Sequence, residues 1–151
     1  MSPARAWALA TALTGAVVAL DQVTKQIAET SVARGDSVSV ALGFDISNVR
    51  NKGVAFGLLG GGETAVVVLT FGALALLLTY FALNAERREL WPAAGLVCGG
   101  ALGNLADRVR AGAVIDFLDP PLWPAFNLAD AAIVIGVALL AISIWQTGAR
   151  M

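Results

Sequence analysis

The sequence predicts a membrane all-α core of four transmembrane helices, with a small β-sheet outside the membrane between the first two. Apolar residues make up 58% of the 151-residue chain and charged residues only 14%, whereas soluble domains are roughly 45–50% apolar and about 25% charged. The mean hydropathy is +0.75, and the apolar residues gather into four long segments. A period of two in the region after the first segment predicts the sheet.

The four predicted transmembrane helices cover about residues 7–23, 64–83, 91–108 and 128–145 of a single domain. A spanning helix needs roughly 20 mostly apolar residues. The second segment reaches that length without a charged residue. The first and third reach it only if their polar ends, at Asp21 and at Asp107–Arg108, lie within the helix near the membrane interface. The first segment also resembles a signal peptide with Arg5 as its charged start, but it lacks a small-x-small cleavage site.

The orientation of the helices follows from the positive charges. Four spans place both termini on one side, which carries four Lys and Arg residues against six on the other. This count opposes a cytoplasmic N-terminus. However, the short turn "NAERREL" after the second span, with Arg87 and Arg88, is typical of a cytoplasmic loop, so we favour both termini inside.

The region between the first two spans, about residues 26–63, has mixed character. Apolar residues alternate there with other residues, which predicts short strands, at Val38, Val40, Leu42, Phe44 and Ile46. We expect a small sheet that rests on the helix ends.

Composition excludes several kinds of chemistry. The chain has no histidine and one cysteine, Cys98. This excludes a His/Cys zinc site, a serine–histidine triad, a cysteine–histidine pair and an internal disulfide. The net charge of −1 gives no indication of nucleic-acid binding. Carboxylates, amides, hydroxyls, Lys and Arg remain. Carboxylate-only metal binding stays open on composition alone, but we predict no metal and no cofactor.

Polar residues stand at the edges of the apolar segments. Asp21 and Lys25 are four apart and share a helical face in the favourable order; the alternative is that Lys25 extends its ammonium into the membrane interface. In "NKGVAFG", Asn51 and Gly53 precede the second apolar segment, and Gly53 permits unusual backbone angles. Taken alone, that motif is typical of an ordinary turn.

The third segment, "GLVCGGALGNLADR", combines small and polar residues. Gly95, Gly99 and Gly103 recur every four residues, which lets another helix approach closely. Asn104 and Arg108 are also four apart, with Asp107 beside them. This pattern favours a packing face capped by an Asp–Arg pair and a functional cluster equally, and the two are compatible.

Asp116 and Asp130 are the acids that neither solubility nor turn chemistry explains. Asp116 stands between two apolar residues, and Asp130 lies one turn into the fourth segment, where it also fits a helix-start acid. Asp119 precedes Pro120, which is turn chemistry. The proline-containing connection is short enough to bring Asp116 and Asp130 to the same membrane edge. Two such carboxylates can share one proton, so that one activates water while the other polarises a carbonyl.

Five motifs together resemble the lipoprotein signal peptidase family, the bacterial aspartic membrane endopeptidases called signal peptidase II. They are "DQVTK" (Asp21–Lys25), "NKGVAFG" (Asn51–Gly57), "GGALGNLADR" (Gly99–Arg108), "VIDF" (Val114–Phe117) and "FNLADAAI" (Phe126–Ile133). They stand in the family's order over nearly the whole chain. The resemblance implies that the chain removes signal peptides from diacylglyceryl-modified prolipoproteins by cutting N-terminal to the lipidated cysteine.

The resemblance also assigns residues and surroundings. It implies a catalytic pair of Asp116 and Asp130, substrate-binding residues Asn51, Asn104, Arg108 and Asn127, and supporting residues Asp21, Lys25, Gly53 and Asp107, the last acting with Arg108. It implies a multi-pass protein of the bacterial cytoplasmic (inner) membrane with both termini cytoplasmic, a site near the outer face and an extracytoplasmic sheet that cradles the substrate. The expected partners are lipid-modified prolipoproteins and membrane lipids, not nucleic acid, and we expect a monomer.

Two other functions fit part of the pattern. An ion- or proton-coupled transporter also uses intramembrane carboxylates, but its charges would lie near the middle of several helices rather than at one edge. A structural membrane-assembly protein explains the glycine stripe but not Asp130. Release of a signal peptide from a lipidated prolipoprotein by the purified protein would separate these three functions.

Overall fold

The computed structural model describes residues 1–41, 43–53 and 62–148. Three predicted features lie outside these residues: Leu42 of the alternating pattern, residues 54–57 of the "NKGVAFG" motif, and Arg150.

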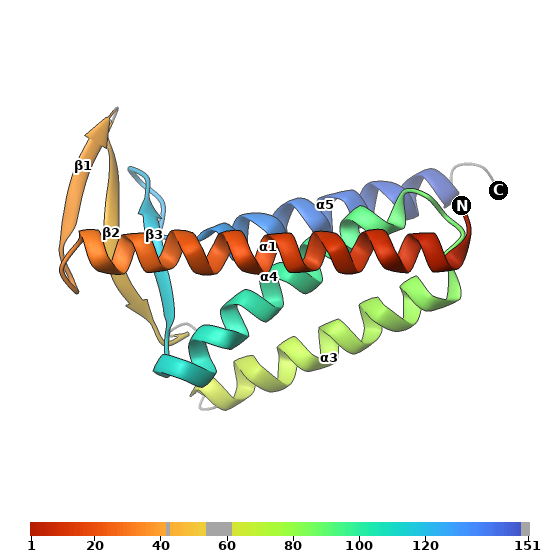
Figure 1. The fold of residues 1–151 in the computed structure, drawn as a ribbon, viewed down its shortest axis with the longest axis horizontal. Coiled ribbons are helices and arrows are strands. Elements are labelled where there is room, and N and C mark those ends of the chain that lie inside the picture. The colour runs from red at the N-terminus through yellow and green to blue at the C-terminus, as the bar shows by residue number, and fades with distance from the viewer. Residues whose placement is uncertain (42, 54–61, 149–151) are drawn as a thin grey trace.

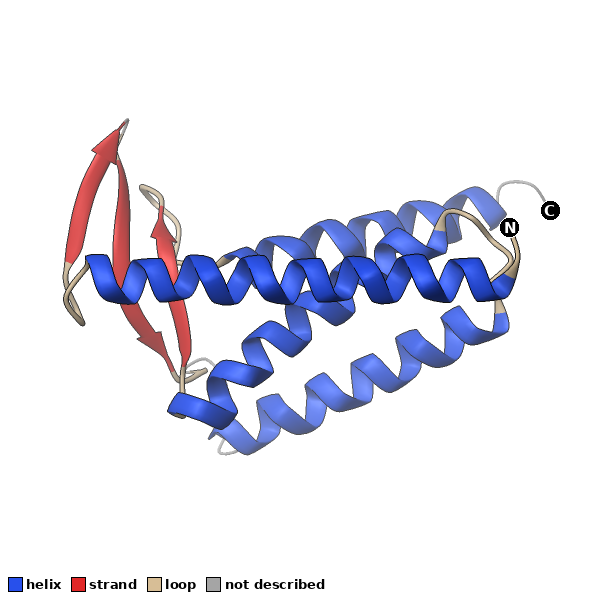
Figure 2. Ribbon diagram, in the orientation of Figure 1, coloured by secondary structure: helices blue, strands red, loops and turns tan. Residues whose placement is uncertain are grey.

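Long helices run side by side, and a small sheet lies across one end of them (Figures 1 and 2). The start of α1 and the end of α5 lie at the opposite end. In chain order the elements are α1 (Pro3–Ser31), β1 (Ser37–Ala41), β2 (Phe44–Asn51), α3 (Gly62–Leu83), α4 (Leu90–Ala111), β3 (Val114–Asp119) and α5 (Leu128–Gly148). The prediction of a mostly helical fold with a small sheet is confirmed.

In the described part of the chain, three helices are long and apolar enough to cross a membrane. These are α1, Thr64–Leu83 of α3 and Leu128–Gln146 of α5, with mean hydropathies of 1.4, 2.4 and 2.3. Helix α4 has a sufficient length of 22 residues. Its glycines and its charged C-terminal end lower its hydropathy, so a fourth span remains a prediction.

Helix α1 is longer than the predicted 7–23. It begins at Pro3, where the fixed φ of proline suits the first helical position. It then continues through Ser31 because its polar second half has its own buried face. Val17, Asp21, Lys25 and Ala28 are buried, and their spacings of four, four and three place them on one side of the helix.

Helix α4 packs against α1 and α5 at close range, as its glycines predict. A Cβ added at Gly99 would lie 2.6 Å from Cβ of Val17, and one at Gly95 would lie 2.9 Å from Cβ of Leu13. On the other side of α4, a Cβ at Gly100 would lie 2.3 Å from the carbonyl oxygen of Ala129. The predicted glycine stripe is therefore the contact face for α1, and Gly100 adds a contact with α5.

The sheet is antiparallel in the order β1-β2-β3. The two strands between α1 and α3 confirm the predicted region. Strand β3 adds to the prediction, which placed the sheet between the first two helices and included no strand at residues 114–119. Residues 114–117 are all buried, so both faces of β3 are covered and its sequence lacks the alternation of a half-exposed strand. Register pairs Asn51 with Val114 and Val49 with Asp116.

Candidate active site

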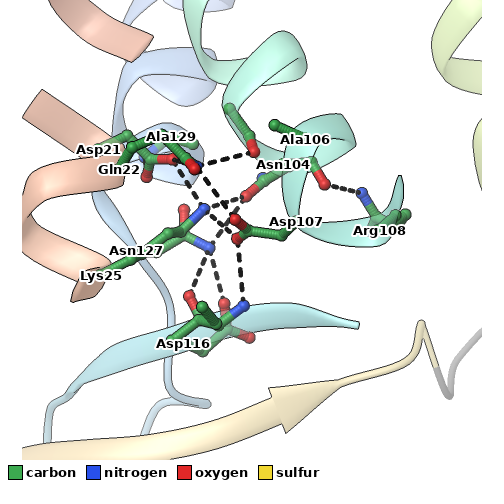
Figure 3. Close-up of polar contacts among 12 residues, drawn as sticks. Asp21, Gln22, Lys25, Asn104, Ala106, Asp107, Arg108, Asp116, Asn127 and Ala129 are labelled. Atoms are coloured by element: carbon green, nitrogen blue, oxygen red, sulfur yellow. Dashed lines mark hydrogen bonds and ion pairs between the residues drawn. The ribbon is translucent and has the colours of Figure 1, made fainter. Parts of the chain in front are cut away.

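A group of polar side chains lies where α1, α4 and the start of α5 meet β3. Figure 3 shows Asp21 and Lys25 of α1 facing Asn104 and Asp107 of α4, with Asp116 of β3 across from them. Buried polar groups need hydrogen-bonding or charged partners, and in this group the side chains and the neighbouring backbone supply them.

The start of α5 is fixed by a reciprocal pair of hydrogen bonds. The backbone N–H of Asp130 donates to Oδ1 of Asn127 (2.9 Å), and the backbone N–H of Asn127 donates to Oδ2 of Asp130 (3.3 Å). This is a capping box, with Asn127 as the cap and Asp130 three residues later. The helix-start interpretation of Asp130 is therefore correct, and it leaves Oδ1 of Asp130 for another contact.

A third N-terminal N–H of α5 is satisfied from α1. The backbone N–H of Ala129 donates to Oδ1 of Asp21 at 2.9 Å. Asp21 is fully buried, and its carboxylate fits only because Gly103 of α4 has no side chain: a Cβ there would lie 2.6 Å from Oδ2 of Asp21. A negative charge is also favourable at a helix N-terminus.

Lys25 lies inside this group rather than at the membrane interface, because its ammonium is surrounded by acceptors. Its side chain is 2% exposed, and Nζ lies 2.8 Å from Oδ2 of Asp21 and 2.7 Å from Oδ2 of Asp107. Nζ also donates to Oδ1 of Asn104 at 2.9 Å. Three contacts use all three donors of an ammonium group, so the alternative of an extended Lys25 is wrong.

Asp116 is held between two side-chain amides. Nδ2 of Asn51 donates to its Oδ2 (2.9 Å), and Nδ2 of Asn127 donates to its Oδ1 (2.7 Å). Oδ1 of Asn51 in turn accepts the backbone N–H of Gly53 (2.8 Å). Gly53 has a φ of +73°, a conformation that favours glycine. The turn thus fixes Asn51, and Asn51 fixes Asp116.

The two candidate catalytic acids are joined by a pair of amides. Nδ2 of Asn104 donates to Oδ1 of Asp130 at 2.7 Å, and Nδ2 of Asn127, which holds Asp116, also lies 3.1 Å from Oδ1 of Asn104. Because Oδ1 of Asn104 accepts from Lys25, its Nδ2 group is turned toward Asp130. The positive charge on Lys25 therefore fixes the orientation of Asn104.

The electrostatic surroundings favour a proton on Asp116. Its pKa is raised from 3.8 to about 6, and the largest cause is burial of the side chain, because a charged carboxylate is poorly solvated there. The hydrogen bond from Asn51 lowers the pKa, and the nearby charge of Asp130 raises it again. Asp130 itself is half-buried.

The predicted site residues come together with one exception. Asp21, Lys25, Asn51, Asn104, Asp107, Asp116, Asn127 and Asp130 form the connected group, and Gly53 supports it through Asn51. Arg108 lies to one side (Figure 3), with Nη1 3.4 Å from the carbonyl oxygen of Asn104. In the described residues no group of three or more His, Cys, Asp and Glu side chains could hold a metal ion.

The predicted Asp107–Arg108 pair is wrong. Asp107 instead contacts Lys25, accepts the backbone N–H of Ile115 (3.3 Å) and lies 3.4 Å from Nη2 of Arg110. Neighbouring residues on a helix point in different directions, whereas residues three apart can meet. Helical spacing alone therefore favours Arg110 over Arg108 as a partner of Asp107.

Gln22 was missed by the sequence analysis. Its Nε2 lies within hydrogen-bonding distance of Oδ2 of Asp21 (3.1 Å), the carbonyl oxygen of Gly103 (3.2 Å) and Oδ1 of Asp107 (3.0 Å). Its place inside the "DQVTK" motif, next to Asp21, was the available signal. Like Lys25, Gln22 links the carboxylate of Asp21 on α1 to that of Asp107 on α4.

Apolar helices of membrane-spanning length and a carboxylate–amide group at one end of them define a membrane enzyme. Comparison with known proteins gives the family. The sequence model of signal peptidase (SPase) II matches residues 13–146, so the chain belongs to the signal peptidase II family and is a peptidase.

Relatives and solved structures agree with this assignment. The chain is 40% identical over 131 residues to the lipoprotein signal peptidase of Halothermothrix orenii, covering 86% of this chain and 90% of the relative. It is 45% identical over 127 residues to that of Pelotomaculum thermopropionicum, covering 83% and 84%. Two solved bacterial membrane enzymes have TM-scores of 0.81 and 0.83 at 37% and 35% identity. The match to the first covers 89% of this chain and 91% of the solved chain, and the match to the second covers 93% and 90%.

Proposed function

We propose that the chain is an aspartic endopeptidase that removes signal peptides from diacylglyceryl-modified bacterial prolipoproteins, cutting N-terminal to the lipidated cysteine. Membership of the signal peptidase II family and the names of the relatives support the substrate. The observation that carries the aspartic mechanism is the link from Asp116 through Asn127 and Asn104 to Asp130.

In this mechanism the two carboxyl groups hold one proton between them. Asp116 carries it, because burial favours its neutral form. The neutral carboxyl donates a hydrogen bond to the scissile carbonyl oxygen, and ionised Asp130 takes a proton from a water molecule. The water oxygen bonds to the carbonyl carbon and gives a tetrahedral intermediate. When the C–N bond breaks, the proton on Asp130 passes to the leaving amine.

The amides and Arg108 are assigned to the substrate. Asn51 and Asn127 keep the carboxyl of Asp116 in place, and Asn104 does the same for Asp130. The guanidinium of Arg108 is half-buried and makes one long contact of 3.4 Å within the described residues. We assign it, with Asn51, Asn104 and Asn127, to contacts with the substrate backbone or its lipid ester. Asp21, Lys25, Gly53 and Asp107 support these side chains.

We also propose the arrangement in the membrane. Helix α4 is the fourth span, so the chain is one domain with spans at about residues 7–23, 64–83, 91–108 and 128–145, in the bacterial inner membrane. Both termini are cytoplasmic, and the sheet end with the site is near the outer face. The placement of the start of α1 and the end of α5 opposite the sheet supports this (Figure 1). The protein works as a monomer among membrane lipids.

The transporter alternative has no support of its own. The acidic side chains of the polar group gather at the sheet end of the helices, whereas an ion pathway needs polar groups along the membrane interior.

The test of the aspartic mechanism replaces each acid in turn. Asp116→Asn and Asp130→Asn should each abolish release of the signal peptide from a lipidated prolipoprotein, because an amide can neither act as the base nor accept the proton. The double variant should be no worse than either single one, since the pair acts as a unit. Asp119→Asn is the matched control, because Asp119 lies on the same strand outside the polar group, and it should cleave at nearly the wild-type rate.

Two outcomes would contradict the mechanism. Robust cleavage by well-folded Asp116→Asn or Asp130→Asn protein would falsify a role for that acid. Equal loss of activity in Asp119→Asn would mean that the substitutions act through the fold of β3 rather than through chemistry. Thermal unfolding of all variants in detergent separates these effects from misfolding.

The orientation has its own test. In a Cys98→Ser background, a cysteine at Asp36 should react with a membrane-impermeant thiol reagent on intact cells with a permeable outer envelope. A cysteine at Glu86 should not react until the inner membrane is opened. The reverse labelling would overturn the proposed orientation and leave the catalytic proposal intact.

A further inference from the structure

The end of the molecule that carries the start of α1 holds a second polar feature, far along the helices from the carboxylate group. It is an open cavity of about 670 Å³, lined by Met1, Ser2, Arg5, Leu9, Arg88 and Trp91. The first turns of α1 form one wall, and the α3–α4 turn with the start of α4 forms the other. The lining contains two guanidinium groups and no carboxylate.

The two arginines of the α3–α4 turn have different roles. Arg87 is turned inward, where Nη2 donates to the carbonyl oxygen (3.0 Å) and Oγ (2.8 Å) of Ser143, and Nη1 donates to the hydroxyl of Tyr80 (3.1 Å). It therefore ties the turn to α5 and α3. Arg87 also pairs with Glu89 of the same turn at 3.1 Å.

Arg5 and Arg88 remain for a ligand from outside. Both are exposed, and neither has a hydrogen bond or ion pair to any of residues 1–41, 43–53 or 62–148. They come from segments more than 80 residues apart in the sequence and line the same cavity. Two exposed guanidinium groups that line one cavity suit an anion with several oxygens, because each offers parallel N–H donors to phosphate.

The surroundings indicate where that phosphate comes from. Trp91 and Leu9 line the cavity beside the arginines, and Trp7 of α1 is 38% exposed close to the same helix end. Tryptophan is enriched at the membrane–water interface, and basic pockets between transmembrane helices bind acidic lipid headgroups. The exposed apolar surface of α1 offers a path for acyl chains, which inorganic phosphate does not need.

We propose that this cavity binds the phosphate group of an anionic phospholipid, with Arg5 and Arg88 holding its oxygens. An anionic headgroup is favoured over a zwitterionic one, because the lining offers no acid to pair with a choline or ethanolamine cation. This site is distinct from the carboxylate group at the sheet end, and its occupancy is measured without any cleavage reaction, so it stands or falls separately from the proposed function.

The experiment measures lipid binding to the full chain in detergent by native mass spectrometry and by the rise in unfolding temperature. Three probes are compared: phosphatidylglycerol, phosphatidylcholine and inorganic phosphate. The variants are Arg5→Gln, Arg88→Gln and the double variant, and Arg34→Gln is the matched control because Arg34 is an exposed arginine at the sheet end. Wild-type protein should retain phosphatidylglycerol over phosphatidylcholine, and each single variant should weaken that binding about fivefold.

The double variant, the control variant and the phosphate competition each test the proposal. The double variant should lose most of the preference for phosphatidylglycerol, while Arg34→Gln keeps it. Equal retention of both lipids would overturn the proposed anionic site. If Arg34→Gln weakened phosphatidylglycerol binding as much as the cavity variants, the binding would come from general surface charge and the proposed site would be wrong. Competition by inorganic phosphate at the same concentration as the lipid would identify a free-anion site instead of a lipid site. The circular dichroism spectrum and the unfolding temperature of each variant without added lipid should match those of the wild type, which shows that the variants remain folded.

Discussion

Gly103 is the position where the smallest change should disturb the site most. Alanine at Gly103 would place a Cβ 2.6 Å from Oδ2 and 3.2 Å from Cγ of Asp21, about 1 Å inside the roughly 3.5 Å of ordinary contact. Asp21 has little room to move, because its carboxylate is held by Lys25 (2.8 Å), by Gln22 (3.1 Å) and by the backbone N–H of Ala129 (2.9 Å).

The magnitude follows from what the displaced carboxylate loses. Removing one partner of a buried ion pair costs about 3–5 kcal/mol, and a displacement that weakens the contacts without abolishing them costs about 2–4 kcal/mol. Replacing glycine with alanine inside a helix by itself raises the free energy of unfolding by about 1 kcal/mol. Gly103→Ala should therefore lower the free energy of unfolding by about 1–3 kcal/mol. Gly72→Ala in α3, where an added Cβ meets nothing within 4 Å, should raise it by up to about 1 kcal/mol.

The assay is reversible unfolding in mixed micelles with increasing dodecyl sulfate, measured by circular dichroism for both variants and the wild type. The cleavage rate of Gly103→Ala should also fall, because Lys25 orients Asn104 through the same group. Equal stability of Gly103→Ala and Gly72→Ala would refute the reasoning, since both replace a helical glycine and only one has Asp21 against it.

Three further predictions use the same unfolding and cleavage measurements. Because burial raises the pKa of Asp116 from 3.8 to about 6, the contribution of its protonated form to stability is complete below pH 4 and is lost as the pH rises through 6. The difference of about 2 in pKa is worth about 3 kcal/mol of unfolding free energy. Asp116→Asn should remove this part of the pH dependence. Lys25→Met leaves the buried carboxylate of Asp21 without its cation and leaves Asp107 only its long contact with Arg110, so it should lower the free energy of unfolding by about 3–5 kcal/mol. A change below about 1 kcal/mol would contradict a stabilising role of this buried ion pair. Asn51→Ala removes a hydrogen bond to the carboxyl of Asp116, the proposed proton carrier, worth about 1.5–3 kcal/mol, so turnover should fall about tenfold to a hundredfold. Asn84→Ala, at the end of α3, should cleave normally.

The helices and the candidate acids were predictable because their signals are local. An uncharged run such as 64–83 has few stable alternatives to a helix in a membrane. The glycine spacing of α4 predicted a close contact correctly, since four residues bring the glycines to the same helical face. Asp116 and Asp130 stood out because an acid among apolar residues needs a specific reason, and both proved to be hydrogen-bonded within one group.

Other features depended on partners far away in the sequence. Strand β3 is covered on both faces, so its residues 114–117 carry no alternation, and only its pairing with β2 reveals it. The surroundings of Lys25 could not be read from α1, because two of its three acceptors lie on α4. A lysine near a helix end fits an interfacial position and a buried position equally until the opposite helix is known.

The bond between Asp21 and the backbone of Ala129 joins positions 108 residues apart, and this separation constrains how the protein is made. As the chain is synthesised, α1 is made first, and within it Lys25 can pair only with Asp21, while Asp21 can also accept from Gln22. Asp107 and Asn104 arrive with α4, and the capping contacts form only when α5 follows. A nascent or truncated chain that ends before Asn127 therefore has buried charges with incomplete partners and no second carboxyl for Asp116. Under the proposed mechanism, which needs both Asp116 and Asp130, hydrolysis therefore begins only after the last helix is in place.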